Sequence, residues 1–205
     1  MLITIFILIV LFFSIVIHEI AHGSVAFSLG DPTAKESGRL TLNPLKHIDP
    51  VGTIFLPLIL LILTFGKGPI FGWAKPVPIN PYNFRDQKWG MFKVSIAGPL
   101  TNFLIALIFG LLIRIFILPN PLFIFFSIIA VYNFAWGIFN LVPIPPLDGS
   151  HILFTILPRK FSDFKFSLQR YGLFILLIFI FFGLDWIFRL SELFYTLISG
   201  RPFII

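Results

Sequence analysis

The chain places the sequence His18-Glu19-Ile20-Ala21-His22 inside an apolar run that extends from Leu2 to Leu29. A run of this length is sufficient for a helix that crosses a bilayer, which needs about 20 apolar residues. An ionisable side chain near the bilayer centre costs about 2.5–3.5 kcal/mol, so three of them on one helical turn indicate a functional site. The fold class that follows is an all-α polytopic membrane protein whose first helix carries this site.

The composition of the chain supports a membrane protein. Of the 205 residues, 58% are hydrophobic and 12% are charged, whereas soluble domains have about 25% charged residues. We expect a single membrane-embedded domain over 1–205 with the lipid bilayer as a partner. We expect no nucleic-acid binding, because the net charge of +6 forms no basic stripe on a soluble fold. The absence of cysteine excludes thiolate ligands, so a metal site must use His, Asp or Glu.

The spacing of the two histidines predicts a metal site on one helix face. Residues four apart on a helix lie about 5–6 Å apart, so His18 and His22 can converge on one cation. Glu19 lies beside them and can take a proton from the attacking water. The motif therefore indicates a zinc hydrolase, and a third protein ligand is expected elsewhere because a catalytic zinc normally has three.

The apolar segments predict four membrane spans and one re-entrant hairpin. The spans are expected at 1–29, 90–118, 122–149 and 171–188. The apolar segment 51–65 would extend about 22 Å as a helix, short of the roughly 30 Å hydrocarbon core, so we expect it to re-enter rather than cross. We also expect short extended segments, a strand at 39–42 and an extended stretch at 72–78, where Gly and Pro collect.

The distribution of basic residues predicts the orientation. If 51–65 does not cross, the connections 30–50, 66–93 and 158–170 share one side and hold 12 of the 15 basic residues. Cytoplasmic loops collect Lys and Arg, so this side is expected to be cytoplasmic and the amino terminus external.

The best candidate for the third ligand is Asp148. It follows the prolines at 143, 145 and 146, which break the end of the predicted span 122–149. Non-helical backbone at membrane depth is tolerated where it lines a water-filled cavity, and a hydrolase in a membrane needs such a cavity. The sequence leaves other candidates open, namely His47, Asp49, His151 and Asp185.

Two amide side chains, Asn102 and Asn140, lie within or at the end of predicted spans. Such an amide can donate to a developing oxyanion or position the scissile carbonyl of a substrate. Hydrogen bonding between helices explains it equally well. Both residues are therefore candidates for substrate positioning, with the structural role left open.

The motifs together resemble the site-2 protease family, intramembrane zinc metalloproteases of peptidase family M50. The histidine motif, the segment Ala97-Gly98-Pro99 to Asn102, and Asn140 through Gly149 carry the resemblance, in the order and spacing of the family. The resemblance covers nearly the whole chain and is strongest to compact prokaryotic members without PDZ or CBS domains. The segment 51–65 departs from the family pattern.

The resemblance implies a site, a substrate and a location. One Zn2+ per chain would be held by His18, His22 and Asp148, with Glu19 as general base and acid and Asn140 assisting substrate binding. A three-span core followed by a fourth span would cleave transmembrane segments of other membrane proteins, in regulated intramembrane proteolysis. The site would lie towards the cytoplasmic side of a prokaryotic plasma membrane.

Two other functions remain open from the residues alone. A non-catalytic scaffold that contains zinc would bind transmembrane helices without cutting them, but a purely structural site has no need of the base Glu19. A metal transporter would need ionisable residues along a path through several helices. Here these residues collect at one level, which disfavours transport.

Overall fold

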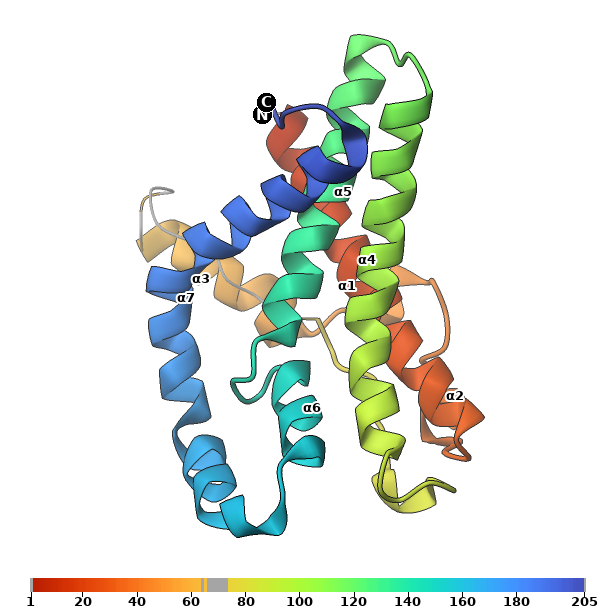
Figure 1. The fold of residues 1–205 in the computed structure, drawn as a ribbon, viewed down its shortest axis with the longest axis vertical. Helices are drawn as coiled ribbons and strands as arrows, with labels where there is room; N and C mark the ends of the chain where they lie inside the picture. Colours follow the sequence, from red (N-terminus) through yellow and green to blue (C-terminus); the bar gives the residue numbers. More distant parts are fainter. Residues whose placement is uncertain (1, 64, 66–73, 205) are drawn as a thin grey trace.

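Four long apolar helices dominate the computed structural model, which describes residues 2–63, 65 and 74–204. They are α1 (Leu2–Ser28), α4 (Gly90–Ile115), α5 (Asn120–Leu141) and α7 (Ser162–Ser199), and each is long and apolar enough to cross a membrane. Figure 1 shows α4 and α5 side by side, with α1 inclined against them. Within these residues the fold is all-α, as predicted, and the protein is a multi-pass membrane protein.

The third span, predicted at 122–149 with an end broken by prolines, corresponds to α5 and the stretch that follows it. α5 stops at Leu141, and the rest of 122–149 is a non-helical stretch followed by the start of α6 (Asp148–Ile156). Pro143, Pro145 and Pro146 lie in this stretch. Proline lacks the N–H that a helix interior requires, which explains why the break falls here.

The fourth predicted span, 171–188, is part of a longer helix. α7 begins at Ser162 and continues without a break to Ser199, where Gly200 adopts a positive φ of 70° and ends it. Its last turns pack on the bundle, because Tyr195 is fully buried and its hydroxyl lies 2.7 Å from Ser127 Oγ on α5. Residues 189–199 therefore belong to this helix and pack one side of it on the bundle.

The predicted strand at 39–42 is wrong. The N–H of Arg39 donates to the carbonyl of Ala34 and so extends the turn that ends α2 (Thr33–Glu36). A strand needs a partner strand for its backbone groups, and the described part of the chain contains none. Residues 74–78 of the predicted extended stretch carry no helix, while residues 72 and 73 lie outside the described residues.

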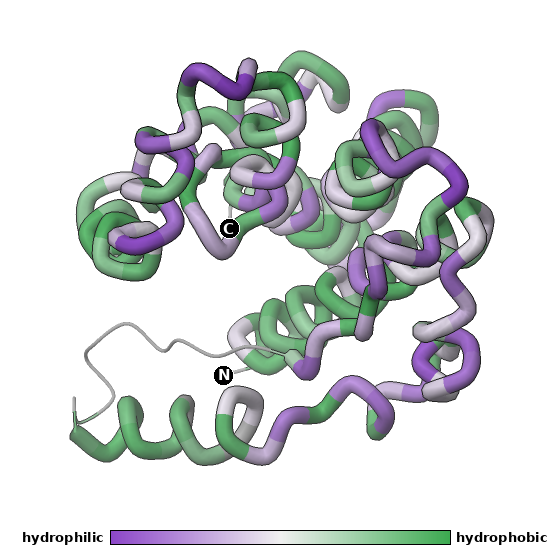
Figure 2. The backbone as a smooth tube through the Cα atoms, turned by 90° about the horizontal axis from the view of Figure 1, so that it is seen from below, coloured by the Kyte–Doolittle hydropathy of each residue, from purple (hydrophilic) through white to green (hydrophobic). Residues whose placement is uncertain are grey.

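The segment predicted to re-enter the membrane is helical over most of its length. A π-helical turn at Pro50–Phe55 leads into α3 (Leu56–Leu63). Figures 1 and 2 both show α3 lying across the long axis of the bundle rather than along it. Residues 64 and 66–73, which would complete the return, lie outside the described residues, so the re-entrant hairpin stays a prediction.

The core that supports the site lies between α4, α5 and α7. Lipid tails are as apolar as the side chains of these helices, so their association depends on close packing and on hydrogen bonds. Small residues allow the close approach, since Ala106 of α4 and Ala130 of α5 are fully buried. Larger buried side chains fill the remaining space, namely Ile113, Val131, Phe134, Ile138, Ile187 and Tyr195.

Polar connections gather at one end of the bundle, and Figure 2, viewed from that end, shows hydrophilic residues concentrated in them. Buried Asp31 follows α1 and accepts hydrogen bonds from Thr33, from the N–H of Asn80 (2.7 Å) and from Asn83 Nδ2 (2.8 Å). Burial alone would raise the pKa of Asp31, but these hydrogen bonds outweigh it and lower the pKa. The ionised carboxylate therefore ties segment 80–83 to the end of α1 and brings residues 74–80 alongside that helix.

Candidate metal centre

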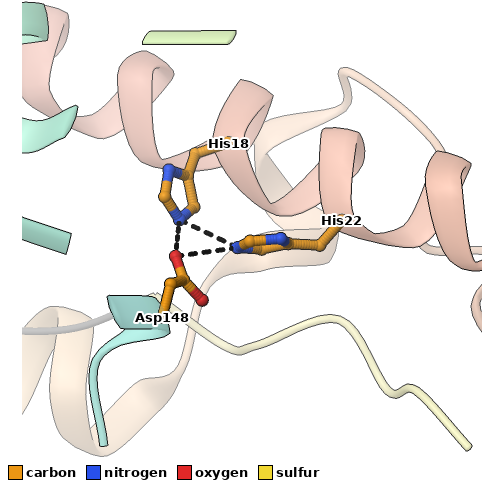
Figure 3. A group of neighbouring side chains, drawn as sticks. All are labelled: His18, His22 and Asp148. Atoms are coloured by element: carbon orange, nitrogen blue, oxygen red, sulfur yellow. Dashed lines mark hydrogen bonds and ion pairs between the residues drawn. The ribbon is translucent and has the colours of Figure 1, made fainter. Parts of the chain in front are cut away.

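The structure brings three of the predicted site residues together, as Figure 3 shows. His18 and His22 lie on one face of α1, and Asp148 is the first residue of α6. Asp148 Oδ2 lies 3.0 Å from His18 Nε2 and 3.2 Å from His22 Nε2, and the two nitrogens are 3.0 Å apart. Among the described residues, this is the only group of His, Asp or Glu whose donor atoms converge closely enough to hold one ion.

Asp148 reaches the histidines because α6 begins very close to the end of α5. A Cβ on Gly149 would lie 2.2 Å from the carbonyl oxygen of Leu141 and 2.5 Å from that of Val142. No side chain fits at such distances, so the tight return of the chain requires glycine at position 149. The prolines end the helix and Gly149 allows the next one to start beside it.

The hydrogen bonds of the two Nδ1 atoms determine which nitrogen of each imidazole carries the proton. His22 Nδ1 lies 2.7 Å from the carbonyl oxygen of Val94, which can only accept, so Nδ1 is the donor. His18 Nδ1 lies 2.7 Å from Asn102 Oδ1, which is also an acceptor, so this Nδ1 donates as well. In a neutral ring the other nitrogen then carries a lone pair. Both Nε2 atoms therefore direct lone pairs towards Asp148.

Three lone-pair donors that face one another fit a cation between them. Neither Nε2 nor the carboxylate has a hydrogen to share, so their separations of 3.0–3.2 Å would be repulsive without a positive charge. In a tetrahedral zinc site with bonds of about 2.0–2.1 Å, ligand atoms lie about 3.3–3.4 Å apart. Two imidazoles and one carboxylate are also a ligand set of catalytic zinc. The donors therefore fit zinc in both chemistry and spacing.

Helix α4 approaches the two imidazoles at Gly98. A Cβ at this position would lie 2.6 Å from His18 Cε1, His18 Nε2 and His22 Nε2. The absence of a side chain thus lets α4 pack directly on the donor atoms. Sequence reasoning missed Gly98 as a site residue, since glycine offers no reactive group and its only signal is the pattern Ala97-Gly98-Pro99 within an apolar span.

Glu19 is held by the segment that runs beside α1. Its Oε2 accepts a hydrogen bond of 2.8 Å from the backbone N–H of Val77. Val77 is itself buried, so the donor is fixed in place. A backbone amide is a neutral donor, and it orients the carboxylate next to the two histidines without balancing its charge.

The other candidates for the third ligand are not among the converging donors. His47 is fully buried, and its Nε2 donates to the carbonyl of Thr41 (2.9 Å). Asp49 caps the following helical turn by accepting from the N–H of Gly52, and Asp185 is exposed on α7. His151 lies half-buried on α6, and burial lowers the pKa of its imidazole. None of them joins His18, His22 and Asp148 among the described residues.

The two predicted amides lie in different surroundings. Asn140 is buried near the end of α5, where its Nδ2 donates to the carbonyl of Trp136 one turn earlier (3.0 Å). Asn102 is fully buried on α4 and contacts His18 directly.

Comparison with known proteins shows which family the chain resembles. The model of peptidase family M50 matches residues 118–182. The chain is 40% identical over 182 residues to a Bacillus subtilis protein named “Putative zinc metalloprotease YwhC”. The alignment covers 84% of this chain and 78% of that protein. The chain is 29% identical over 157 residues to “Zinc metalloprotease MJ0392” of Methanocaldococcus jannaschii, covering 77% of this chain and 36% of that protein. No solved structure matches the chain.

Proposed function

The chain belongs to peptidase family M50 and is a zinc metalloprotease, and from this premise we propose that it cleaves peptide bonds within transmembrane segments of other membrane proteins. The position of the two histidines on α1 carries the proposal. At 1.5 Å per residue, His18 and His22 lie about 15 Å and about 9 Å from the end of α1 at Ser28. The hydrocarbon core is about 30 Å thick, so a substrate bond that reaches these residues lies at membrane depth.

Each residue of the site has its own role in the proposed peptide hydrolysis. His18, His22 and Asp148 would hold the zinc ion, which supplies a Lewis acid that polarises the scissile carbonyl and activates water. Glu19 takes the proton of the attacking water and returns it to the leaving amine. Asn140, at the end of α5 next to the broken stretch, would assist substrate binding.

The orientation of the bundle supports a site towards the cytoplasmic side. Figure 1 shows α2, the connection that precedes α4 and the connection between α6 and α7 at the same end of the molecule. The basic residues collect in these connections, and such residues mark the cytoplasmic side. The relatives come from bacteria and archaea, which supports a prokaryotic plasma membrane and, with the family, a role in regulated intramembrane proteolysis.

Cleavage in proteoliposomes tests the proposal. The purified chain and a single-span model substrate with Gly and Asn in its transmembrane segment are reconstituted together, and the products are mapped by mass spectrometry. We expect cleavage inside the transmembrane segment, loss of cleavage with a zinc chelator and recovery when zinc is returned.

The matched control is a substrate whose transmembrane segment is a leucine helix with the same soluble flanks. A helix locks its amides in hydrogen bonds, so this control should be cut much more slowly. Cleavage confined to the soluble flanks, at the same rate in both substrates, would contradict an intramembrane specificity.

A further inference from the structure

A chain of buried amides continues from the metal centre into the bundle. Asn102 on α4 and Asn133 on α5 are both buried almost completely. Asn102 Nδ2 donates to Asn133 Oδ1 (2.9 Å), and Asn133 Nδ2 donates to the carbonyl of Ile129 (2.9 Å). With the bond from His18 Nδ1 to Asn102 Oδ1 (2.7 Å), these contacts form one path through α1, α4 and α5.

The carbonyl of Ile129, where the path ends, fixes which atom donates and which accepts in each hydrogen bond of the path. The carbonyl of Ile129 can only accept, so the amide of Asn133 must turn its Nδ2 towards it and its Oδ1 towards Asn102. Asn102 must then present Nδ2 to Asn133, and the same Nδ2 lies 3.3 Å from a second acceptor, the carbonyl of Ser14. Oδ1 of Asn102 is left to face His18.

We propose that Asn133, acting through Asn102, positions His18 as a metal ligand. The inference rests on the proposed role of His18 in holding zinc. Asn133 keeps the Asn102 amide in the orientation that accepts from His18 Nδ1 and thereby keeps the lone pair of this imidazole on Nε2. Without Asn133, only the longer contact with the carbonyl of Ser14 (3.3 Å) holds Nδ2 of Asn102, and the amide can turn over and present its NH2 group to His18 Nδ1. The proton of the neutral ring would then lie on Nε2, where it blocks the metal.

This role differs from hydrogen bonding that merely joins helices. An interhelical bond stabilises a bundle wherever it lies, as the bond between Ser127 of α5 and Tyr195 of α7 does. Asn133, in contrast, binds the same amide group that binds His18. Partners that orient a ligating histidine typically contribute 10- to 100-fold to metal affinity, so their loss is measurable.

Zinc affinity by chelator competition tests the proposal in detergent-purified full chains. Asn102→Ala and Asn133→Ala should each weaken zinc binding by about 10-fold or more. The double variant should bind zinc no more weakly than Asn102→Ala alone, because Asn133 acts through Asn102. The cobalt-substituted Asn133→Ala variant should also show a changed visible absorption spectrum, since the geometry at His18 changes.

Two further variants separate positioning from stability. Ser127→Ala removes a buried hydrogen bond from the same helix without touching the path, so it should leave zinc affinity and the cobalt spectrum unchanged. Asn133→Asp should restore affinity close to that of the wild type. Burial favours a neutral carboxylic acid, whose hydroxyl donates to Ile129 and whose other oxygen accepts from Asn102.

The possible failures can be distinguished. If His18→Ala keeps full zinc affinity, or if the wild type binds no zinc, the ligand role of His18 and this inference both fall. If His18→Ala loses zinc but Asn133→Ala matches the wild type, only the inference falls. Equal losses in Asn133→Ala and Ser127→Ala, or additive losses in the double variant, would also overturn it.

Discussion

Replacement of Glu19 by glutamine is expected to abolish peptide cleavage while zinc stays bound. Glutamine cannot accept the proton of the attacking water, and general acid–base catalysis typically contributes about 10²–10⁴-fold to the rate. Glutamine can still accept the hydrogen bond that Val77 donates to Glu19, so the surrounding backbone should keep its place. Glu19 is outside the group of converging donors, so the zinc content should not change.

Cleavage of the reconstituted model substrate and metal analysis on the same preparation measure this prediction. Glu36→Gln, on the exposed surface of α2, is the matched control and should cleave normally. Residual cleavage close to the wild-type rate would remove the role assigned to Glu19. A parallel loss of zinc would show that this carboxylate supports the metal rather than the proton transfer.

Replacement of Gly98 by alanine is expected to disrupt the metal centre without touching a ligand. The added Cβ would lie 2.6 Å from three atoms of the His18 and His22 rings, so both rings must move. Overpacking of this kind costs about 1–3 kcal/mol, which corresponds to zinc binding weaker by about 5- to 150-fold. Cleavage at limiting zinc should fall in proportion.

Gly110→Ala provides the control within the same helix. A Cβ there would meet Ile198 Cγ2 at 2.9 Å, so this variant also overpacks α4, but Gly110 is remote from the histidines in sequence and contacts. Zinc titration of both variants should show weakened binding in Gly98→Ala alone. Equal affinity of Gly98→Ala and the wild type would mean that α4 does not confine the imidazoles.

The parts of this site that the sequence could predict are those with a local or chemical signal. The helical period places His18 and His22 on one face, and the need for a third ligand, together with the proline break, points to Asp148. The structure brings these three residues together. The roles of Gly98 and Asn133 had no such signal, because each depends on which atoms of another helix lie opposite.

The fold predictions that differ from the structure also rested on local sequence patterns. The strand predicted at 39–42 rested on local pattern alone, whereas a strand requires a partner that only the tertiary structure can supply. The helix that contains the span predicted at 171–188 extends beyond it at both ends, where charged residues such as Arg170 and Arg189 weaken the apolar pattern. The helix nevertheless continues to Ser199, since no proline or glycine follows Gly183 before Gly200 and Tyr195 packs into the core.

The zinc content of the detergent-purified wild type beside Asp148→Ala tests the central claim most directly. Asp185→Ala, which removes an exposed aspartate of α7, is the control. We expect about one zinc ion per chain in the wild type and the control, and a loss or strong weakening of zinc binding in Asp148→Ala. This result would join α1 and α6 in a single metal site. Zinc retained at full affinity without Asp148 would contradict the account, because the site would then have a different third ligand.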